Sequence, residues 1–157
     1  MMKRIVVFSD THGNIHPCLR ILPGLGEISL LLHLGDTVTD GEELHAAYPH
    51  IPFLAVKGNN DWFSSVPDLA VATVENVKIL CCHGHLLSRS QLVYEAQKRQ
   101  CQVALFGHTH RSLVEQTEEG ILLMNPGSAS LPRDGQASCG IIEIEHHMPK
   151  AAVIPLH

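Results

Sequence analysis

Short apolar runs recur through the first two thirds of the chain, and each stops at a polar, mostly glycine-containing segment. The five runs are IVVF (5–8), LLLHL (30–34), FLAV (53–56), KILCC (78–82) and VALF (103–106). They lack the strict apolar–polar alternation that is typical of a strand with one face in water. We therefore predict strands that are buried on both faces, in a sheet with other layers packed on each side.

Helical patterns lie between these runs. The first covers 14–22, with Pro17 tolerated in its first turn and Pro23-Gly24 at its end. Two further helices are predicted to begin with a capping box, in which a polar residue is followed three positions later by Glu or Gln. These boxes are Asp40 with Glu43, for a helix to about Tyr48, and Ser88 with Gln91, for a helix to about Gln100.

After His110 the pattern changes to strands without helices. The predicted strands are 113–117, 121–124, 140–145 and 151–154. Strand–helix alternation followed by strands alone predicts an α/β (α+β) fold, in which two packed β-sheets are flanked by helices. With no linker or low-complexity tract, we expect residues 1–157 to form one domain.

Composition and charge narrow the class of protein. The chain carries 11 Lys plus Arg against 16 Asp plus Glu, without a basic run, so we expect no stable binding to nucleic acid. The apolar run at the N-terminus is too short for a secretory signal, and no stretch could cross a membrane. The cysteine count is odd, at five, without a CxxC motif, which predicts reduced, mostly buried thiols and a cytoplasmic location.

Histidine is the compositional anomaly, with 12 in 157 residues, and several follow the apolar runs directly. Parallel strands place their C-terminal ends along one edge of a sheet, where open α/β sheets bind ligands. The residues with metal-binding side chains at these ends are Asp10, His12, Asp36, Asn59, His83, His108 and His110. In Asp10-x-His12 and His108-x-His110, extended backbone would point both side chains the same way.

Carboxylate and amide oxygens combined with imidazoles suit Mn, Fe, Zn or a similar divalent ion. Seven ligands exceed what one ion takes, so we predict two ions that share a bridging carboxylate, an arrangement suited to phosphoryl transfer. Taken singly, each residue could instead be a cap or a polar turn. Because five strand ends in one short chain all carry metal-binding side chains, the metal site is favoured.

The ordered motifs Asp10-x-His12, Gly35-Asp36, Gly58-Asn59, His83-Gly84-His85 and Gly107-His108-Thr109-His110 resemble those of the calcineurin-like metallophosphoesterase superfamily. Asn125-Pro126-Gly127-Ser128 and the short chain resemble its small YfcE-like phosphodiesterase branch. The resemblance covers nearly the whole chain, and it implies a four-layer αββα sandwich, the metallo-dependent phosphatase fold.

The resemblance also implies roles for individual residues. Asp10, His12 and His110 would hold the first ion, and Asp36 would bridge both ions. The second ion would be held by Asn59, His83 and His108. The implied cofactors are two divalent metal ions, Mn first, with Fe, Zn or Ni as alternatives.

One residue departs from the wider superfamily. Many members follow the Gly-Asn pair with a histidine that assists the leaving group, whereas Asn60 stands there in this chain. The small branch also lacks that histidine and commonly has an Asp one place later, matching Asp61. Asn60, Asp61 and His85 are therefore predicted to face the substrate or to support the ligands, and His33 is predicted to be a hydrogen-bonded core residue.

The function predicted from these residues is hydrolysis of a small phosphodiester by attack of a metal-bridging hydroxide. The residues predicted to take part in catalysis are Asp36, Asn59, Asn60 and His85. One alternative is a catalytically weak protein-interaction scaffold of the same fold, and another is a phosphomonoesterase. Exposed sheet edges would allow a homo-oligomer.

Overall fold

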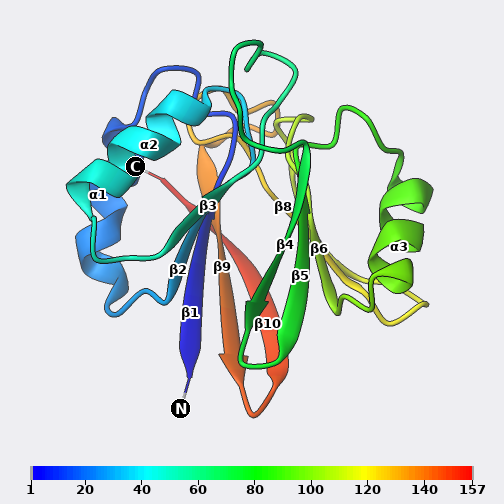
Figure 1. The fold of residues 1–157 in the computed structure, drawn as a ribbon. Coiled ribbons are helices and arrows are strands. Elements are labelled where there is room, and N and C mark those ends of the chain that lie inside the picture. Colours follow the sequence, from blue (N-terminus) through cyan, green and yellow to red (C-terminus); the bar gives the residue numbers. More distant parts are fainter. Residues whose placement is uncertain (1, 157) are drawn as a thin grey trace.

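The computed structural model describes residues 2–156, which form two five-stranded sheets packed face to face (Figure 1). The β1 sheet has the order β10-β9-β1-β2-β3, and the β5 sheet has the order β4-β5-β6-β8-β7. The strands of the β1 sheet are β1 (Lys3–Phe8), β2 (Leu30–His33), β3 (Phe53–Ala55), β9 (Ser138–Glu145) and β10 (Met148–Pro155). Those of the β5 sheet are β4 (Leu69–Val74), β5 (Val77–Cys82), β6 (Val103–Leu105), β7 (Ser112–Gln116) and β8 (Leu122–Pro126).

Both sheets are mixed. In the β1 sheet, β1, β2 and β3 run parallel, and β9 is antiparallel to its neighbours β1 and β10. In the β5 sheet, β5, β6 and β8 run parallel, and β4 and β7 are antiparallel edge strands. The five predicted strand ends are therefore divided between the sheets, three in one and two in the other.

Alternate residues of each central strand enter different layers. Ile5 and Val7 of β1 are buried in the core between the sheets, together with Ile79 of β5. Val6 and Phe8 point the other way, into the core beneath α1 (His16–Ile21) and α2 (Val38–Ala47). The outer face of the β5 sheet packs on α3 (Arg89–Lys98), so helices flank the sheet pair on both sides (Figure 1). Because each sheet is covered on both faces, the predicted αββα arrangement is confirmed.

One predicted capping box is confirmed and the other is wrong. Ser88 accepts a hydrogen bond from the backbone N–H of Gln91 at 3.2 Å and donates its own N–H to the Gln91 side chain at 2.8 Å. Asp40 does not cap α2, which begins two residues earlier at Val38. The buried Asp40 carboxylate instead accepts the backbone N–H of Gly13 at 2.7 Å. Asp40 therefore ties α2 to the loop after β1.

The structure also corrects the boundaries near the N-terminus. The helix predicted over 14–22 is shorter, and a 3₁₀ turn, η1 (Leu22–Leu25), continues it through Pro23 and Gly24. At the Pro-Gly pair the helical path therefore continues as a tighter 3₁₀ turn and does not stop, as the sequence had suggested.

Strand β4 was not predicted. It pairs with β5 through a tight turn at Glu75 and Asn76, where φ is +48° and +63°. Left-handed residues in a two-residue hairpin are usually signalled by Asn-Gly or Asp-Gly. Glu-Asn gives a weaker signal, so the hairpin is difficult to recognise in the sequence.

All five cysteines are free and buried, as the sequence predicts. Between residues 2 and 156, no helix has the length and apolar character needed to traverse a bilayer.

Candidate metal centre

Backbone hydrogen bonds join the loops that carry the predicted ligands. The N–H of Asp10 donates to the carbonyl of Gly35 at 2.9 Å, and the N–H of Gly107 donates to the carbonyl of His83 at 2.8 Å. The ring of His83, which follows β5, lies 2.8 Å from the carbonyl of Leu34, which follows β2. Loops from both sheets therefore meet at one site, and the side chains of all seven predicted ligands converge there.

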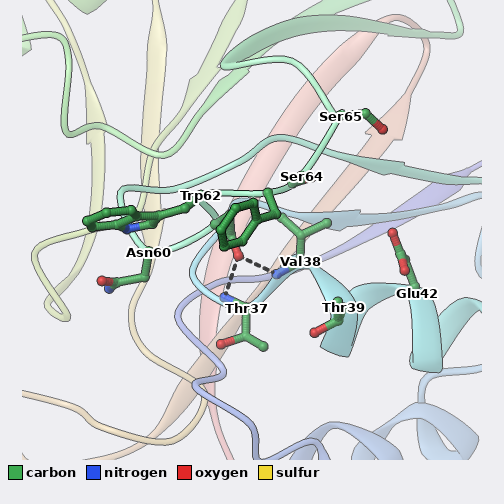
Figure 2. A pocket seen from close by; sticks show the side chains of 10 residues that line it. Thr37, Val38, Thr39, Glu42, Asn60, Trp62, Ser64 and Ser65 are labelled. Atoms are coloured by element: carbon green, nitrogen blue, oxygen red, sulfur yellow. Dashed lines mark hydrogen bonds between the residues drawn. The ribbon is translucent and has the colours of Figure 1, made fainter.

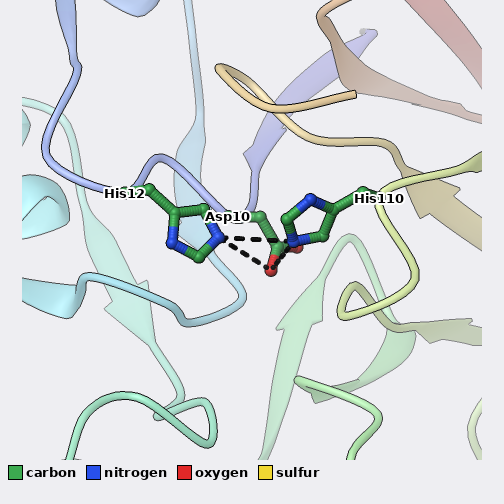
Figure 3. Close-up of side chains that lie close together, drawn as sticks. All are labelled: Asp10, His12 and His110. Carbon is green, nitrogen blue, oxygen red and sulfur yellow. Dashed lines mark hydrogen bonds and ion pairs between the residues drawn. The ribbon is translucent and has the colours of Figure 1, made fainter. Parts of the chain in front are cut away.

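Asp10, His12 and His110 form the first group (Figure 3). Oδ1 of Asp10 lies 3.8 Å from Nε2 of His12 and 3.3 Å from Nε2 of His110. The two imidazole nitrogens are 3.3 Å apart. Three ligand atoms with this spacing can surround one divalent ion.

The second group consists of Asn59, His83 and His108. Nδ1 of His108 lies 3.1 Å from Oδ1 of Asn59 and 3.2 Å from Nε2 of His83. His83 has no solvent-exposed surface, whereas Asn59 is exposed. The group therefore has a buried side and a side that opens to solvent.

Two carboxylates, not one, lie between the groups. Oδ2 of Asp36 is 3.9 Å from Nε2 of His12 and 3.5 Å from Nε2 of His83. Oδ1 of Asp10 is 3.7 Å from that same His83 nitrogen, so Asp10 also approaches both groups. The resemblance assigned the bridge to Asp36 alone, and the structure gives Asp10 a comparable position.

Asn60 fixes the orientation of Asp36. Its backbone N–H donates to Oδ1 of Asp36 at 3.0 Å, and its side-chain amide donates to Oδ2 at 2.9 Å. Burial by itself raises the pKa of Asp36, but hydrogen bonds from His83 and Asn60 and the charge of His83 hold the pKa well below its usual range. Asp36 therefore remains a carboxylate at neutral pH.

Two imidazoles are held in the tautomer that binds metal through Nε2. Nδ1 of His83 lies 2.8 Å from the carbonyl of Leu34, and Nδ1 of His110 lies 2.7 Å from the carbonyl of Leu131. A carbonyl only accepts, so each Nδ1 carries the proton and leaves the Nε2 lone pair directed into the site. Burial lowers the pKa of His83, but Asp36 and Asp10 outweigh that effect and raise it above its usual value.

The backbone reason given for this convergence was wrong. Extended backbone was expected to align Asp10 with His12 and His108 with His110, yet φ is positive at all four, between +46° and +70°. Asp36 also has positive φ, at +54°. Asp, Asn and His tolerate the left-handed region better than most residues. The direction of these side chains is therefore set by sharp turns after the strands, and not by extended strand backbone.

Glycines before the ligands allow the loops to approach each other closely. A Cβ atom on Gly58 would collide with Oδ1 of Asp36, and one on Gly107 would collide with Oγ of Ser9. These contacts explain why Gly58 precedes Asn59 and Gly107 precedes His108.

The donor set fits divalent metal ions. Oδ1 of Asp10 is fully buried, yet it has no hydrogen-bond partner among the described residues. An unpaired buried carboxylate oxygen is costly unless a cation compensates it. Since three imidazole nitrogens surround this oxygen at 3.3–3.8 Å, metal ions are the cations that this site is built to hold.

Three residues outside the ligand set support it: Ser130, which the sequence did not indicate, and Ser128 and Asp61, which the sequence motifs had singled out. Ser128 donates to the carbonyl of Asp10 at 2.8 Å, and Ser130 donates to the carbonyl of Thr11 at 2.7 Å, so this downstream loop fixes the turn after β1. Asp61 was predicted to face substrate or support the ligands. Its carboxylate accepts the backbone N–H groups of Asp36, Thr37, Val38 and Gly58, so it supports the loops that carry the ligands Asp36 and Asn59.

His85 and His33 differ in their surroundings. The His85 ring lies 5.4 Å from that of His83 and 6.2 Å from that of His108, and its buried Nδ1 has no hydrogen-bond partner among residues 2–156. His33 is only 1% exposed; its Nδ1 accepts the N–H of Gly35, and its Nε2 lies 3.0 Å from Oγ1 of Thr11. The prediction that His33 is a hydrogen-bonded core residue is confirmed.

Comparisons with known proteins agree with this geometry. The family model described as the calcineurin-like phosphoesterase superfamily domain matches residues 2–147. The probable metallophosphoesterase YsnB of Bacillus subtilis is 34% identical over 135 residues, covering 82% of this chain and 76% of that protein. The phosphodiesterase YfcE of Escherichia coli K12 is 27% identical over 168 residues, covering 90% of this chain and 88% of that protein.

Solved structures share the fold. A predicted phosphoesterase from Streptococcus pneumoniae superposes with a TM-score of 0.80 at 26% identity, covering 99% of this chain and 90% of that one. Vps29 from Entamoeba histolytica, in complex with zinc, superposes with a TM-score of 0.74 at 20% identity, covering 98% and 99% of the two chains. At that identity, the second match supports only the fold.

Proposed function

Since the chain belongs to the calcineurin-like phosphoesterase superfamily, we propose that it is a dinuclear metal-dependent phosphodiesterase that hydrolyses small phosphodiesters. The observation that carries this proposal is the cluster of seven ligand side chains, in which Oδ1 of the buried Asp10 is unpaired. Two divalent ions held there would provide a nucleophile from water at neutral pH and offset negative charge on the phosphoryl oxygens. We keep Mn as the first choice of metal.

In this proposal, the protein's side chains hold the two metal ions and orient the ligands and the substrate. Asp10, His12 and His110 hold one ion and Asn59, His83 and His108 hold the other, with Asp36 between them. Asn60 is a positioning residue because its backbone N–H and its side-chain amide both donate to the Asp36 carboxylate. The ring of His85 lies beside the second group, 5.4 Å from that of His83 and 6.2 Å from that of His108, where it would face the substrate or support these ligands.

The preference for diesters rests on Asn60 and on the relatives. An asparagine cannot protonate a leaving group, so substrates whose leaving group departs as an anion are favoured. The relative YfcE is named a phosphodiesterase. A small substrate, a cytoplasmic location and one domain over residues 1–157 belong to the same proposal, as does a homo-oligomer formed through a sheet edge.

The test combines metal content with activity. The protein is loaded with Mn²⁺, and bound metal is counted by elemental analysis. Rates are compared for bis(4-nitrophenyl) phosphate and 4-nitrophenyl phosphate. We expect two ions per chain and faster hydrolysis of the diester, and His110→Ala should lose both metal and activity. The control is His146→Ala, which removes a histidine exposed on the β9–β10 turn.

Two results would favour the alternatives. A chain that binds two ions yet hydrolyses neither ester would be a protein-interaction scaffold of the same fold. A faster rate on the monoester would identify a phosphomonoesterase.

A further inference from the structure

The loop after Asn59 presents two aromatic side chains to solvent. Trp62 is 81% exposed and Phe63 is 102% exposed, the highest values among the exposed large apolar side chains of residues 2–156. Trp62 is also the sole tryptophan of the sequence. Neither ring contributes to a hydrophobic core, so core packing does not explain their presence.

These rings border a hollow of about 540 Å³. That volume lies within the roughly 300–1,000 Å³ range of small-molecule sites. Figure 2 shows Trp62 and Asn60 at one end of the hollow, and Glu42 of α2 at the other end. The lining also includes the hydroxyl residues Thr37, Thr39, Ser64 and Ser65.

The hollow adjoins the metal centre. Asn60 lines it and also donates two hydrogen bonds to Asp36, and Thr37 is the residue that follows Asp36. Trp62 is three residues after Asn59, so their Cα atoms are separated by at most about 11 Å. A phosphoryl group at the metal centre could therefore extend one of its ester substituents into the hollow.

The aromatic loop is held in place before any ligand arrives. Asp61, directly before Trp62, accepts N–H groups of Asp36 and Gly58, each at 2.8 Å, and of Val38 at 2.9 Å. The N–H of Ser64 then returns to the carbonyl of Asp61 at 3.2 Å. Because the backbone of this loop is already fixed, binding of a ligand against it carries no entropic cost for ordering the loop.

The chemistry of the lining indicates what the hollow accepts. It contains two aromatic rings, hydroxyl groups and the carboxylate of Glu42, but no lysine or arginine. An additional phosphate group would find no cation there. A flat, uncharged ring could stack on Trp62 or Phe63, and an N–H on its edge could donate to Glu42.

We propose that the hollow formed by Trp62, Phe63 and Glu42 is a subsite for a planar aromatic ester substituent of the phosphodiester, with a nucleobase as the fitting class. This inference rests on the proposed phosphodiesterase function. Stacking on an aromatic side chain is typically worth about a tenfold gain in binding or more.

Binding is tested without catalysis. Because Trp62 is the sole tryptophan, its fluorescence reports occupancy of the hollow directly. In EDTA, thymidine should quench the emission saturably, and Phe63→Ala should weaken binding about tenfold. Tyr94→Ala, which removes an exposed aromatic ring on α3, should leave the titration unchanged. Absence of saturable quenching in the unsubstituted protein would overturn the subsite.

Catalysis provides the second arm. Two phosphodiesters are compared with the Mn²⁺-loaded protein. Both have trifluoroethanol as a leaving group without a ring, and the second ester group is methyl in one and thymidin-5′-yl in the other. We expect kcat/KM to favour the thymidyl ester about tenfold or more, Trp62→Ala to bring that ratio close to one, and Tyr94→Ala to preserve it. Glu42→Gln should reduce the preference for the thymidyl ester relative to a benzyl ester.

The two proposals fail in different ways. Hydrolysis of both esters at equal kcat/KM would overturn the subsite and leave the phosphodiesterase intact. Hydrolysis of neither ester, nor of bis(4-nitrophenyl) phosphate, would overturn the phosphodiesterase, and the fluorescence titration would then decide the subsite. A dimer in sedimentation that Trp62→Ala dissociates, without quenching by thymidine, would identify the rings as a contact between copies and overturn the subsite.

Discussion

Replacing Asp61 tests whether its carboxylate is a structural clamp. Oδ2 accepts the N–H groups of Asp36 and Gly58, both at 2.8 Å, and Oδ1 accepts those of Thr37 at 3.2 Å and Val38 at 2.9 Å. The carboxylate thereby serves the first N–H groups of α2, since Thr37 is the N-cap residue and makes no side-chain cap of its own.

The expected cost follows from counting these donors. In Asp61→Asn, one oxygen keeps its two N–H partners, while the new amide group faces the other two donors and cannot accept from them. Loss of two charge-assisted hydrogen bonds costs about 3 kcal/mol in the free energy of unfolding. Loss of the negative charge at the N-terminus of α2 adds about 0.5 kcal/mol.

The assay is urea unfolding in EDTA, so that metal binding does not contribute to the measured free energy. Asp61→Asn should lower this free energy of unfolding by about 3.5 kcal/mol. In a thermal melt, the same loss would lower the melting temperature by about 7–14 °C for a chain of this size. Asp134→Asn is the matched control. The exposed Asp134 accepts the N–H and hydroxyl of Ser112 at 2.7 and 2.9 Å. Because water can take the place of this carboxylate, we expect Asp134→Asn to lower the free energy of unfolding by less than about 1 kcal/mol.

A cost below about 1 kcal/mol in Asp61→Asn would refute the clamp. The competing view is that Asp61 gives a proton to the leaving group. That role would leave stability unchanged and would slow the hydrolysis of esters with poor leaving groups far more than that of activated aryl esters.

Further predictions concern individual side chains. Asp36→Asn should bind fewer than two ions per chain by elemental analysis, because its carboxylate approaches both ligand groups; two ions at full occupancy would contradict this. Ser88→Ala should lower the free energy of unfolding by about 1 kcal/mol through loss of its cap, measured with urea. Burial lowers the pKa of His33 to about 4, so only the unfolded chain takes up this proton between pH 6.5 and 4. Stability should therefore fall as the pH drops through that range, by about 3 kcal/mol, and His33→Gln should remove this part of the pH dependence in urea titrations. Burial raises the pKa of Cys82 and Cys139 to about 12, so both should resist aromatic disulfide reagents at pH 8 until the protein is unfolded.

The sequence predicts this fold well where buried apolar runs determine it. The central strands and the apolar face of α3 are long enough to leave a pattern, and Ser88 with Gln91 marks the start of that helix locally. Asp40 shows the limit of such local rules. Its spacing from Glu43 fits a capping box, yet its carboxylate bonds to Gly13 in a loop 27 residues earlier. Long-range partners of this kind leave no local trace in the chain.

At the metal centre, too, the sequence indicated the residue types but not the long-range contacts that arrange them. Residue types alone brought the seven predicted ligands together, but they did not show that the ligands come from two different sheets. Asp36 follows a strand of the β1 sheet and His83 follows a strand of the β5 sheet, and the contact of His83 with Leu34 crosses between them. The spacing of the ligands therefore depends on how the two sheets pack, through residues such as Val7 and Ile79 in the core between them. A change of volume in that core would alter the metal centre without touching a ligand, because close-packed interiors transmit such strain.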